Sequence, residues 1–514
     1  MNTEPEEGYF TQINYTSGYF RQLNPRHVDF ALLVEGLDTM PPGPCCELGY
    51  GQGVSLAMHA AGDSSRPWWG TDFMPTHARH AQQLVDAAGV PATADCQGFA
   101  EFFARDDLPQ FAFIALHGVW SWVSAPHRAL IANFLARRLL PGGVAYISYN
   151  TQVGWAEQLP LRQLLMQHVQ AQGTPAMTVQ ERVRAAGKFV DQMLAVDNPL
   201  TRATPGLRVR FAELQAQAPE YLLHEMLSRD WHLSSLGEVM TDLQHTQLSW
   251  ATTTELWQRN LAIHFSVAQQ QALAGLPGGA LRESARDLFA GQRLRRDLFV
   301  RGPRRLSAPE QRERLMATRL VLMQPPEQVP GTLSGPAGQE VIPSRVLTGI
   351  VKPMAQAAGP LALGELCRHV HDQGGVVVDA VNLVTHLVGA GTLQVAQAAE
   401  ETARSRPATG RLNAHLLHRA SLRQDIQTLA SPVIGGGVPV SALHQRLLAA
   451  RQADPEHPNT WAAHVAGGLL RSGQTLQRDG KDVSDPAVMA QMLTPTVDTF
   501  RQQQLPVLQR LQVV

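Results

Sequence analysis

The sequence predicts an α/β fold with a doubly wound parallel sheet in its first third, followed by mainly helical segments. Between Pro44 and Asn150, continuous apolar stretches of strand length alternate with amphipathic stretches of helix length. This alternation is typical of a parallel sheet whose two faces are covered by helices. A glycine-rich turn follows the first strand of the series. In such sheets ligands bind beyond the carboxyl ends of the strands, so a site is expected there.

The glycine-rich turn lies within residues 44–54, which read Pro-Cys-Cys-Glu-Leu-Gly-Tyr-Gly-Gln-Gly-Val. The strand ends at Glu47, and residues 55–61 have the composition of a helix. Because glycine has no Cβ and tolerates positive φ, such a turn lets a ligand approach bare backbone at the positive end of a helix. The spacing is not the Gly-x-Gly-x-x-Gly of a dinucleotide site, since Val54 stands where its last glycine would be.

An acidic strand end followed by Gly-x-Gly-x-Gly suits S-adenosylmethionine (SAM) instead, because SAM has no phosphate groups to bind. The cationic methionine part of SAM favours a nearby carboxylate, so we expect Glu47 to face it. Gly49 and Gly51 would then let the cofactor lie against the backbone. The alternative is a glycine-rich turn that binds no ligand.

Two further acids end the next strands. Asp72 closes the apolar run that begins at Trp68. Counted from Gly53 of the turn, its position is close to the offset of about 20 residues at which a carboxylate can bind ribose hydroxyls. Asp95 follows another strand-like stretch, where the adenine amino group would lie. Acids at three successive strand ends strengthen the prediction of a SAM site. The predicted cofactor-binding residues are Glu47, Gly49, Tyr50, Gly51, Gly53, Asp72, Phe73, Asp95, Cys96 and His117.

Composition and charge narrow the possible functions. The formal net charge is −1, so no overall charge favours nucleic acid or an anionic membrane as a partner. The four cysteines show no spacing typical of zinc ligands, and no metal site is expected. No apolar run reaches about 18 residues and the polar N-terminus is unlike a signal peptide, so we expect a soluble, cytoplasmic protein without membrane insertion.

Several pieces of the sequence resemble a known family. One of them, His-Gly-Val-Trp-Ser-Trp-Val at 117–123, follows a predicted strand, and another, Ala-Tyr-Ile-Ser-Tyr-Asn-Thr at 145–151, lies mostly within the next one. Further pieces lie at 220–225, 295–302 and 430–434. Together they resemble the bacterial class I methyltransferases that carry a methyltransferase regulatory domain, whose characterised members methylate lysines of outer-membrane proteins in intracellular bacteria. The resemblance implies a Rossmann-like sheet, SAM as cofactor and a protein substrate.

The N-terminal part departs from the family pattern. The family has Tyr-Pro and Thr-His-Pro where this chain has Tyr15-Thr16 and Leu23-Asn24-Pro25. The residue between the first two glycines of the turn, often Cys in the family, is Tyr50. The N-terminal segment is expected to shape the opening through which the substrate enters. These differences are therefore expected to affect the identity of the substrate more than the binding of the cofactor.

Composition changes along the chain suggest a division into segments. A stretch rich in Pro and Gly marks a boundary or a hairpin-bearing loop, and helical segments with Gly-rich breaks follow it. The expected division is a lid segment at 1–35, a SAM-dependent methyltransferase domain at 36–175, a helical middle or regulatory domain at 176–324, a linker at 325–345, and a helical, winged-helix-like C-terminal domain at 346–514. The first segment could also pack against the sheet edge rather than form a lid.

Aromatic and polar side chains are expected to bind the methyl acceptor. Methyl transfer is an in-line displacement, so the protein mainly aligns the acceptor atom and excludes water. A lysine must first lose its proton, at a cost of about 4–5 kcal/mol at about pH 7. An aromatic, partly apolar mouth lowers that cost, and a ring face can hold the amine. The predicted acceptor-site residues are His117, Asn150, Trp120, Trp122, Tyr15 and Tyr19, with packing in the core as the alternative for each.

Three functions fit the sequence. The first is a protein-lysine N-methyltransferase that acts on a deprotonated lysine, for example of a surface or outer-membrane protein before export. The second is an O- or N-methyltransferase for a glycan or small molecule, which would have a fully buried pocket. The third is a non-catalytic SAM-binding scaffold, which would have a blocked cofactor mouth. No nucleic-acid partner is expected, and a homodimer is implied only by the family likeness.

Overall fold

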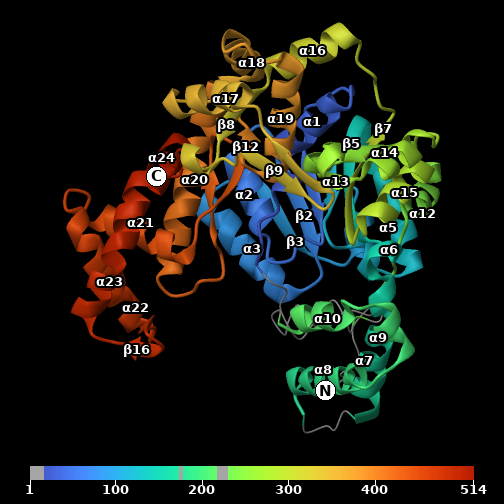
Figure 1. The fold of residues 1–514 in the computed structure, drawn as a ribbon, viewed down its shortest axis with the longest axis horizontal. Coiled ribbons are helices and arrows are strands. Elements are labelled where there is room, and N and C mark those ends of the chain that lie inside the picture. Colours follow the sequence, from blue (N-terminus) through green and yellow to red (C-terminus); the bar gives the residue numbers. More distant parts are fainter. Residues whose placement is uncertain (1–16, 173–176, 217–227, 229) are drawn as a thin grey trace.

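The computed structural model describes residues 17–172, 177–216, 228 and 230–514. A seven-stranded sheet lies at the centre, in the order β3-β2-β1-β4-β5-β7-β6 (Figure 1). All neighbouring strands are parallel except that β7 runs antiparallel to both β5 and β6. This Rossmann-like order with one reversed strand is that of the class I methyltransferase sheet and confirms the predicted fold class. The strands are β1 (Cys45–Leu48), β2 (Trp68–Asp72), β3 (Ala92–Cys96), β4 (Phe111–Leu116), β5 (Leu139–Asn150), β6 (Leu248–Thr253) and β7 (Leu294–Arg301).

Helices pack on both faces of the sheet. The helix that follows Asp72 is α3 (Pro75–Ala88), which starts with a proline and ends at Gly89 in the left-handed conformation. The next long helix, α5 (Ala125–Arg138), ends where Leu139 pairs with Phe111 as the first residue of β5. The other helices of this part are α1 (Pro25–Val34), α2 (Val54–Gly62), α4 (Phe99–Phe103) and α6 (Gln152–Trp155).

The last two strands of the sheet come from residues that were predicted to form a helical middle region. β7 lies along β5 with Asn150 opposite Leu294 and Val144 opposite Val300, and β6 pairs with the far side of β7. The sheet therefore extends past the expected boundary at residue 175, and the domain boundaries stay a prediction. The helices between these strands and just before them are α12 (Leu236–Asp242), α13 (Leu261–His264), α14 (Val267–Ala274) and α15 (Ala280–Ala290).

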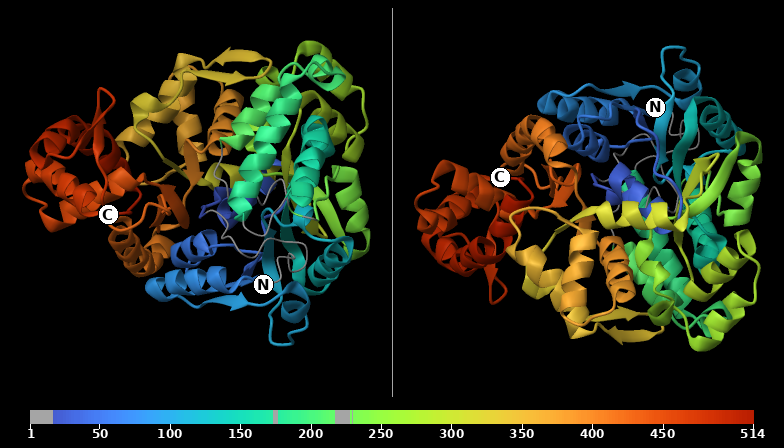
Figure 2. Two further views of the ribbon diagram at one scale, coloured as in Figure 1. Left: turned by 90° about the horizontal axis from the view of Figure 1, so that it is seen from below. Right: turned by 90° about the horizontal axis from the view of Figure 1, so that it is seen from above.

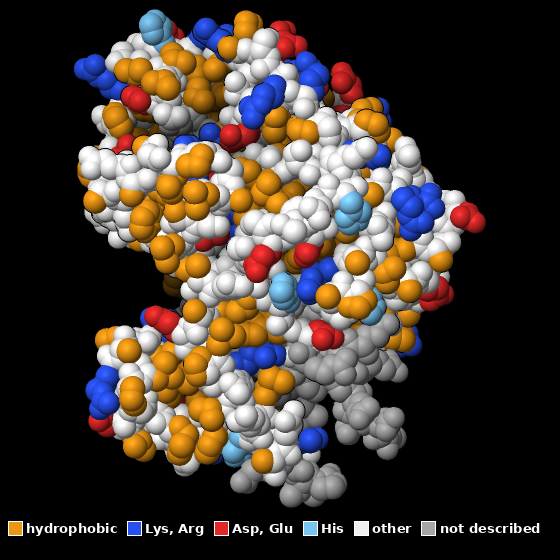
Figure 3. All heavy atoms as spheres, turned by 90° about the vertical axis from the view of Figure 1, so that its right-hand side faces the viewer, with side chains coloured by type: hydrophobic (Ala, Val, Ile, Leu, Met, Phe, Trp, Pro, Cys, Tyr) orange, Lys and Arg blue, Asp and Glu red, His pale blue; other side chains and the backbone are white. Residues whose placement is uncertain are grey.

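Four helices form a lobe below the sheet in Figure 1, which we call the α7–α10 lobe. They are α7 (Leu159–Gln172), α8 (Val179–Ala195), α9 (Pro199–Ala203) and α10 (Leu207–Gln215). The lobe has an apolar core of its own that includes Trp155, Leu165, Val190 and Phe211. Seen from the side, the surface is hollowed at one edge where the lobe meets the rest of the molecule (Figure 3).

The last part of the chain, from α21 (Ala442–Ala453) to α24 (Leu505–Arg510), lies on the far side of the molecule from the middle helices, whereas the preceding C-terminal elements lie beside those helices (Figure 2). A small sheet, β11-β8-β12, with three helices beside it gives the winged-helix-like arrangement. The predicted linker holds the hairpin of β9 and β10. The elements are α16 (Ala308–Ala317), β8 (Arg319–Leu322), β9 (Thr332–Gly335), β10 (Gly338–Val341), α17 (Ser344–Gln356), β11 (Leu361–Ala362), α18 (Leu363–Asp372), α19 (Val377–Ala390), β12 (Leu393–Val395), α20 (Ala399–Ala420), β13 (Thr428–Ser431), β14 (Gly436–Pro439), α21 (Ala442–Ala453), α22 (Trp461–Arg471), β15 (Leu476–Arg478), β16 (Lys481–Val483), α23 (Pro486–Thr499) and α24 (Leu505–Arg510).

The C-terminal part also binds the segment that precedes α1. Helix α20 packs on α2 and α3, and the backbone of Gly62 approaches that of Gly435 so closely that a Cβ would lie 2.5 Å from the Gly435 carbonyl carbon. Asn24 donates a hydrogen bond to the Ile434 carbonyl at 2.9 Å, and Arg26 pairs with Glu401 at 2.9 Å. The N-terminal segment is thus fixed by residues from the far end of the chain. None of the described helices has the length and apolar character needed to span a bilayer.

A buried ion cluster joins β7 to α15. The guanidinium of Arg295, which is 5% exposed, lies 3.2 Å from Glu283, 2.7 Å from Asp287 and 2.7 Å from Asp297. The Tyr149 hydroxyl also donates to Asp297 at 2.6 Å. Burial raises the pKa of Asp287 to about 6 even though the Arg295 charge lowers it. One arginine therefore holds three carboxylates together at the edge of the sheet.

Replacing Arg295 by leucine should destabilise the protein strongly, because it leaves those buried carboxylates without their counter-charge. We expect a loss of about 3–5 kcal/mol in the free energy of unfolding, measured by urea titration. The control is Arg304→Leu, which removes a half-exposed arginine whose ion pair with Asp38 should contribute little to stability, because water screens it. Equal losses in the two variants would contradict a structural role for the cluster.

Candidate active site

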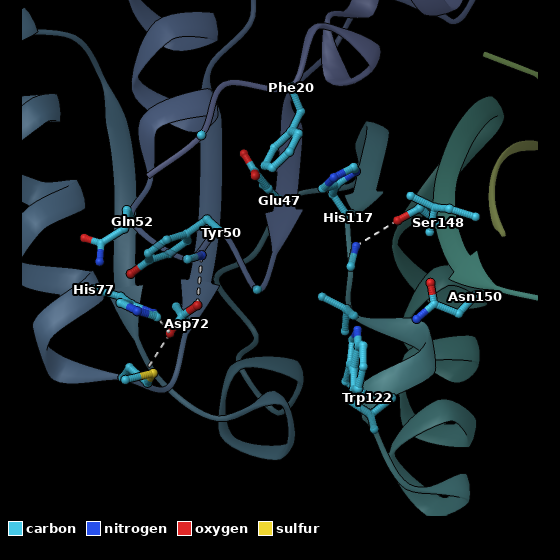
Figure 4. A pocket seen from close by; sticks show the side chains of 18 of the residues that line it. Phe20, Glu47, Tyr50, Gln52, Asp72, His77, His117, Trp122, Ser148 and Asn150 are labelled. Carbon is cyan, nitrogen blue, oxygen red and sulfur yellow. Dashed lines mark hydrogen bonds and ion pairs between the residues drawn. The ribbon is translucent and has the colours of Figure 1, made fainter. Parts of the chain in front are cut away.

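A cavity of about 660 Å³ lies beyond the carboxyl ends of β1, β2, β4 and β5, where the sequence placed the site. Helix α10 of the lobe and the segment before α1 complete its wall. Figure 4 shows Tyr50, Asp72 and His77 on one side of it and His117, Ser148 and Asn150 on the other. The predicted cofactor-binding residues that line it are Glu47, Gly49, Tyr50, Gly51, Asp72, Phe73 and His117.

Glu47 places an unpaired carboxylate in this cavity. The side chain is 3% exposed, and its Oε2 atom has no hydrogen-bond partner among the described residues. Burial, with a smaller contribution from the Asp72 charge, raises the pKa of Glu47 to about 8. A buried polar group without a partner is costly. A cationic ligand would supply the missing partner and favour the ionised carboxylate.

The three glycines of the turn have different roles. Gly49, Gly51 and Gly53 all have positive φ, at 70°, 57° and 71°. A Cβ at Gly49 would lie 2.7 Å from Val119, and one at Gly53 would lie 2.3 Å from Ala81, so packing requires both. A Cβ at Gly51 would meet no atom within 4 Å. Since Gly51 lines the cavity, that open space is where a ligand can lie against the backbone.

Asp72 fixes the conformation of the glycine-rich turn. Its Oδ2 atom accepts a hydrogen bond from the Gly51 backbone amide at 2.9 Å, and Oδ1 accepts one from the Met74 amide at 3.0 Å. His77 Nδ1 lies 3.1 Å from the same Oδ1. A carboxylate oxygen can accept more than one hydrogen bond, so these contacts are compatible with the predicted contact to ribose hydroxyls.

The structure places Asp95 and Cys96 outside the residues that line the cavity. The Asp95 carboxylate is drawn toward Arg105, at 2.8 Å, and its backbone carbonyl accepts a hydrogen bond from the Tyr50 hydroxyl at 2.8 Å. Cys96 is exposed. Residues 97–99 line the cavity instead, so a ligand at this wall would meet the residues that follow the strand rather than its last acid.

His117 lies where the cavity passes from the glycine-rich turn to β5. Its Nδ1 atom is 2.8 Å from the Tyr146 hydroxyl, and its ring centroid is 3.8 Å from that of Phe20. Burial, and then the charge of Arg296, lower the pKa of His117 to about 3. The ring is therefore neutral at physiological pH and brings no positive charge to the cavity.

Asn150 and Trp122 form the other end of the cavity, together with Ser148. Asn150 is 6% exposed, and its backbone is held by a hydrogen bond from its amide to Ser121 Oγ at 2.8 Å. Its side-chain amide makes no hydrogen bond with another described residue, and it faces the space beside Trp122 (Figure 4). Ser148 Oγ accepts a hydrogen bond from the Gly118 amide at 2.8 Å. This end therefore offers a polar amide next to an aromatic face.

Two of the predicted acceptor-site residues, Trp120 and Tyr19, do not line the cavity. Trp120 is fully buried in the core with residues of β4 and β5. It therefore packs in the core, which was the alternative interpretation for this residue. Tyr19 points away toward His59, with 3.2 Å between its hydroxyl and His59 Nε2, and burial raises its pKa to about 12. Tyr15 lies outside the described residues. Phe20, next to Tyr19, lines the cavity in their place.

Several other residues in the cavity wall could not be predicted from the sequence. They lie on α10 and around the start of β7, far along the chain from the glycine-rich turn, so no local pattern connects them to it. Arg293 and Arg296 belong to a locally basic stretch whose composition is typical of a solvated surface. Their place beside Asn150 follows only from the antiparallel pairing of β7 with β5. The charged residues among them are Arg210, Glu213, Arg293 and Arg296.

Comparison with known families matches one segment of the chain. Residues 218–301 match the model of a family described as a predicted methyltransferase regulatory domain. This segment contains β6 and β7, which complete the sheet, and α12 to α15 between and beside them. The match agrees with the sequence resemblance to class I methyltransferases that carry such a domain.

Two relatives show how far the likeness extends. The chain is 29% identical to the uncharacterized protein sll1526 of Synechocystis sp., over 98% of this chain and 99% of that protein. It is 28% identical to the uncharacterized protein RP028 of Rickettsia prowazekii, over 42% of this chain and 86% of that protein. The first of these similarities covers all parts of the molecule.

A solved structure shares the whole architecture. PKMT2 from Rickettsia typhi, in complex with AdoHcy, superposes with a TM-score of 0.67 over 97% of this chain and 99% of that chain. The sequence identity is 16%, so this likeness shows a common fold. The chain therefore combines the class I methyltransferase sheet with a regulatory-domain segment and with C-terminal elements that PKMT2 also has.

Proposed function

We propose that this protein is a SAM-dependent methyltransferase that transfers a methyl group to lysine side chains of a protein. The observation that carries the proposal is the unpaired, buried carboxylate of Glu47 beside the open backbone at Gly51. A ligand with a positive charge and a flat part that can lie against the turn would fit these two features. SAM has both, since its methionine part is cationic and its nucleoside part carries hydroxyl groups for a carboxylate such as Asp72.

The comparisons support SAM as the cofactor. PKMT2, which shares the fold over nearly the whole chain, was solved with AdoHcy. AdoHcy is what remains of SAM after it has given up its methyl group. In this chain Glu47, Gly51 and Asp72 line one continuous cavity, as a shared cofactor site requires.

The other end of the cavity supports a lysine acceptor. His117 is neutral, and the nearby Arg296 guanidinium disfavours a second positive charge, so an amine bound there would be favoured in its reactive, deprotonated form. The amide of Asn150 can accept a hydrogen bond from such an amine, and Trp122 can pack against its methylene groups. The sequence likeness to lysine methyltransferases points to the same acceptor.

The protein's contribution to the reaction would be alignment and exclusion of water. Bound SAM supplies an electrophilic methyl group on a sulfonium. Glu47 would hold the cationic part of the cofactor in place, and Asn150 would orient the lone pair of the amine. Phe20, packed on His117, lines the cavity on the side of the N-terminal segment and would help to exclude water there.

Radiolabelled SAM, added to a bacterial lysate with the purified protein, tests the proposal. We expect label in protein bands and, after acid hydrolysis, in methylated lysine. The matched controls are Gly51→Val, which should abolish labelling, and Gly302→Val, at an exposed turn with a similar φ of 62°, which should retain it. Label only in glycan or small molecules would replace the lysine proposal with the second interpretation, and SAM binding without any transfer would leave a scaffold.

A further inference from the structure

Arg293 differs from the other arginines in the cavity wall. Arg210 pairs with Glu157, and Arg296 pairs with Glu255 at 2.8 Å. Arg293 has no carboxylate within 4.0 Å among the described residues, although it lines the same cavity. Its only hydrogen bond to a described residue goes from Nη2 to the Gln158 amide oxygen at 3.2 Å. No described carboxylate therefore pairs with the positive charge of Arg293.

The side chain of Arg293 is nevertheless held in place. Its guanidinium lies over the Trp155 ring, 4.3 Å from the centroid, and Trp155 is only 4% exposed. The Arg293 carbonyl accepts a hydrogen bond from the Thr151 amide at 3.0 Å. Gly154 lets this backbone come close, since a Cβ there would lie 2.4 Å from the Arg293 Cα. An exposed arginine fixed by an aromatic ring and an amide is prepared to bind an anion, because most of its N–H donors remain available.

The position of Arg293 places that anion next to the methyl acceptor. Leu294, the following residue, pairs with Asn150 across β5 and β7, and Asn150 lies at the acceptor end of the cavity. Trp155 continues the aromatic wall that begins at Trp122, since the Trp231 ring packs against both, at centroid distances of 5.3 and 6.0 Å. A group bound to Arg293 would therefore belong to the substrate rather than to the cofactor.

We infer that Arg293 is a specificity-determining residue that binds a carboxylate of the substrate close to the methylated lysine. The carboxylate is that of an Asp or Glu beside the lysine or that of a chain terminus. A planar guanidinium pairs with a carboxylate through two parallel hydrogen bonds, which fixes both the distance and the orientation of the chain that carries it. This inference rests on the proposed lysine acceptor and names the class of protein sequence that would be methylated.

Methylation of short lysine peptides by the intact protein tests this inference. One peptide carries Glu next to the lysine, a second carries Gln there, and a third ends at the lysine with either a free or an amidated carboxyl group. We expect kcat/KM for the Glu peptide to exceed that for the Gln peptide by about tenfold, as for a hydrogen bond to a charged group. Preference for the free over the amidated terminus would identify the terminal carboxylate as the recognised group instead.

Variants of Arg293 separate charge recognition from other effects. Arg293→Gln should remove the preference by lowering kcat/KM for the Glu peptide about tenfold more than for the Gln peptide, and Arg293→Lys should retain part of the preference. The control is Arg202→Gln on α9, which loses the same charge from an exposed ion pair with Asp197. This variant should keep the full preference for the Glu peptide. Equal kcat/KM values for all peptides in the wild type, or an equal loss on all peptides in Arg293→Gln, would overturn the inference.

Peptide binding gives a readout that does not depend on methyl transfer. Fluorescence anisotropy of the same peptides with the AdoHcy-loaded protein should show tighter binding of the Glu peptide by the wild type and no difference in Arg293→Gln. If no peptide is methylated but this difference is present, the proposed lysine transfer fails and the carboxylate site stands. If peptides are methylated and the difference is absent, the carboxylate site fails and the proposed function stands.

Discussion

Replacing Glu47 by glutamine is expected to weaken SAM binding by about a hundredfold, because it removes the buried charge that faces the cationic part of the cofactor. The same change should stabilise the cofactor-free protein. Glu47 is buried without a partner, so its ionised form destabilises the cofactor-free protein. A neutral amide at the same position would not have this effect. An effect of opposite sign on binding and on stability is expected of a residue that serves a ligand rather than the fold.

The sign of the pH dependence follows from the raised pKa of Glu47. The carboxyl has a pKa of about 8 in the folded protein against an ordinary value of 4.5. Below 4.5 it is protonated in both the folded and the unfolded chain, and stability is unaffected. Between 4.5 and 8 only the folded chain keeps the proton, so the stability of the empty protein falls as pH rises, by at most about 1.4 kcal/mol for each pH unit.

Thermal unfolding of the cofactor-free protein across this pH range measures the effect. We expect the melting temperature of wild type to decline more steeply with pH than that of Glu47→Gln, with the variant more stable above pH 8. Glu313→Gln, at an exposed carboxylate on α16, is the control and should follow the wild-type curve. A variant that is less stable than wild type at every pH would show that Glu47 supports the fold rather than a ligand.

Replacing Gly51 by valine is expected to abolish SAM binding while costing only modest stability. A side chain at Gly51 would enter the open space beside the turn, where the cofactor is proposed to lie. Its φ of 57° imposes a strain of about 1–2 kcal/mol on any residue other than glycine. Gly302→Val carries a comparable strain at a φ of 62° and adds its side chain to an exposed turn, so it separates strain from obstruction.

Equilibrium binding of SAM and urea unfolding of the two glycine variants test this expectation together. Both variants should lose a similar amount of stability, and only Gly51→Val should lose SAM binding. Loss of binding in both would mean that strain, transmitted through the fold, is the cause. Retention of binding in Gly51→Val would place the cofactor elsewhere in the cavity.

Much of the cofactor side of the site could be predicted because it is encoded locally. The strand, the turn and the following helix occupy adjacent residues, and the acid and the glycines have chemical roles at fixed spacing. The bounds of helix α3 are encoded locally in the same way, since a proline starts it and a glycine follows its end. Asp95 follows the same local pattern, yet the structure turns its carboxylate toward Arg105.

Only part of the acceptor side could be predicted, namely His117, Trp122 and Asn150, because the rest depends on contacts between distant residues. Arg293 reaches Asn150 only because β7 inserts antiparallel beside β5. Phe20 lines the cavity where Tyr19 was predicted to do so. The direction of each side chain is set by the C-terminal residues that hold the segment before α1, and the sequence of that segment alone does not contain this information. Trp120 and Trp122 are two positions apart, and only the chain geometry after β4 decides that one is core and the other lines the cavity.

Calorimetric titration of the purified protein with SAM tests the central claim most directly. Two buffers of different ionisation enthalpy, at one pH between 4.5 and 8, report how many protons are exchanged on binding. We predict saturable binding with release of about one proton from the wild type, because the cofactor's charge makes Glu47 ionise, and no such release from Glu47→Gln. Absence of SAM binding, or binding by the wild type without proton release, would contradict the assignment of this cavity as a SAM site built around Glu47.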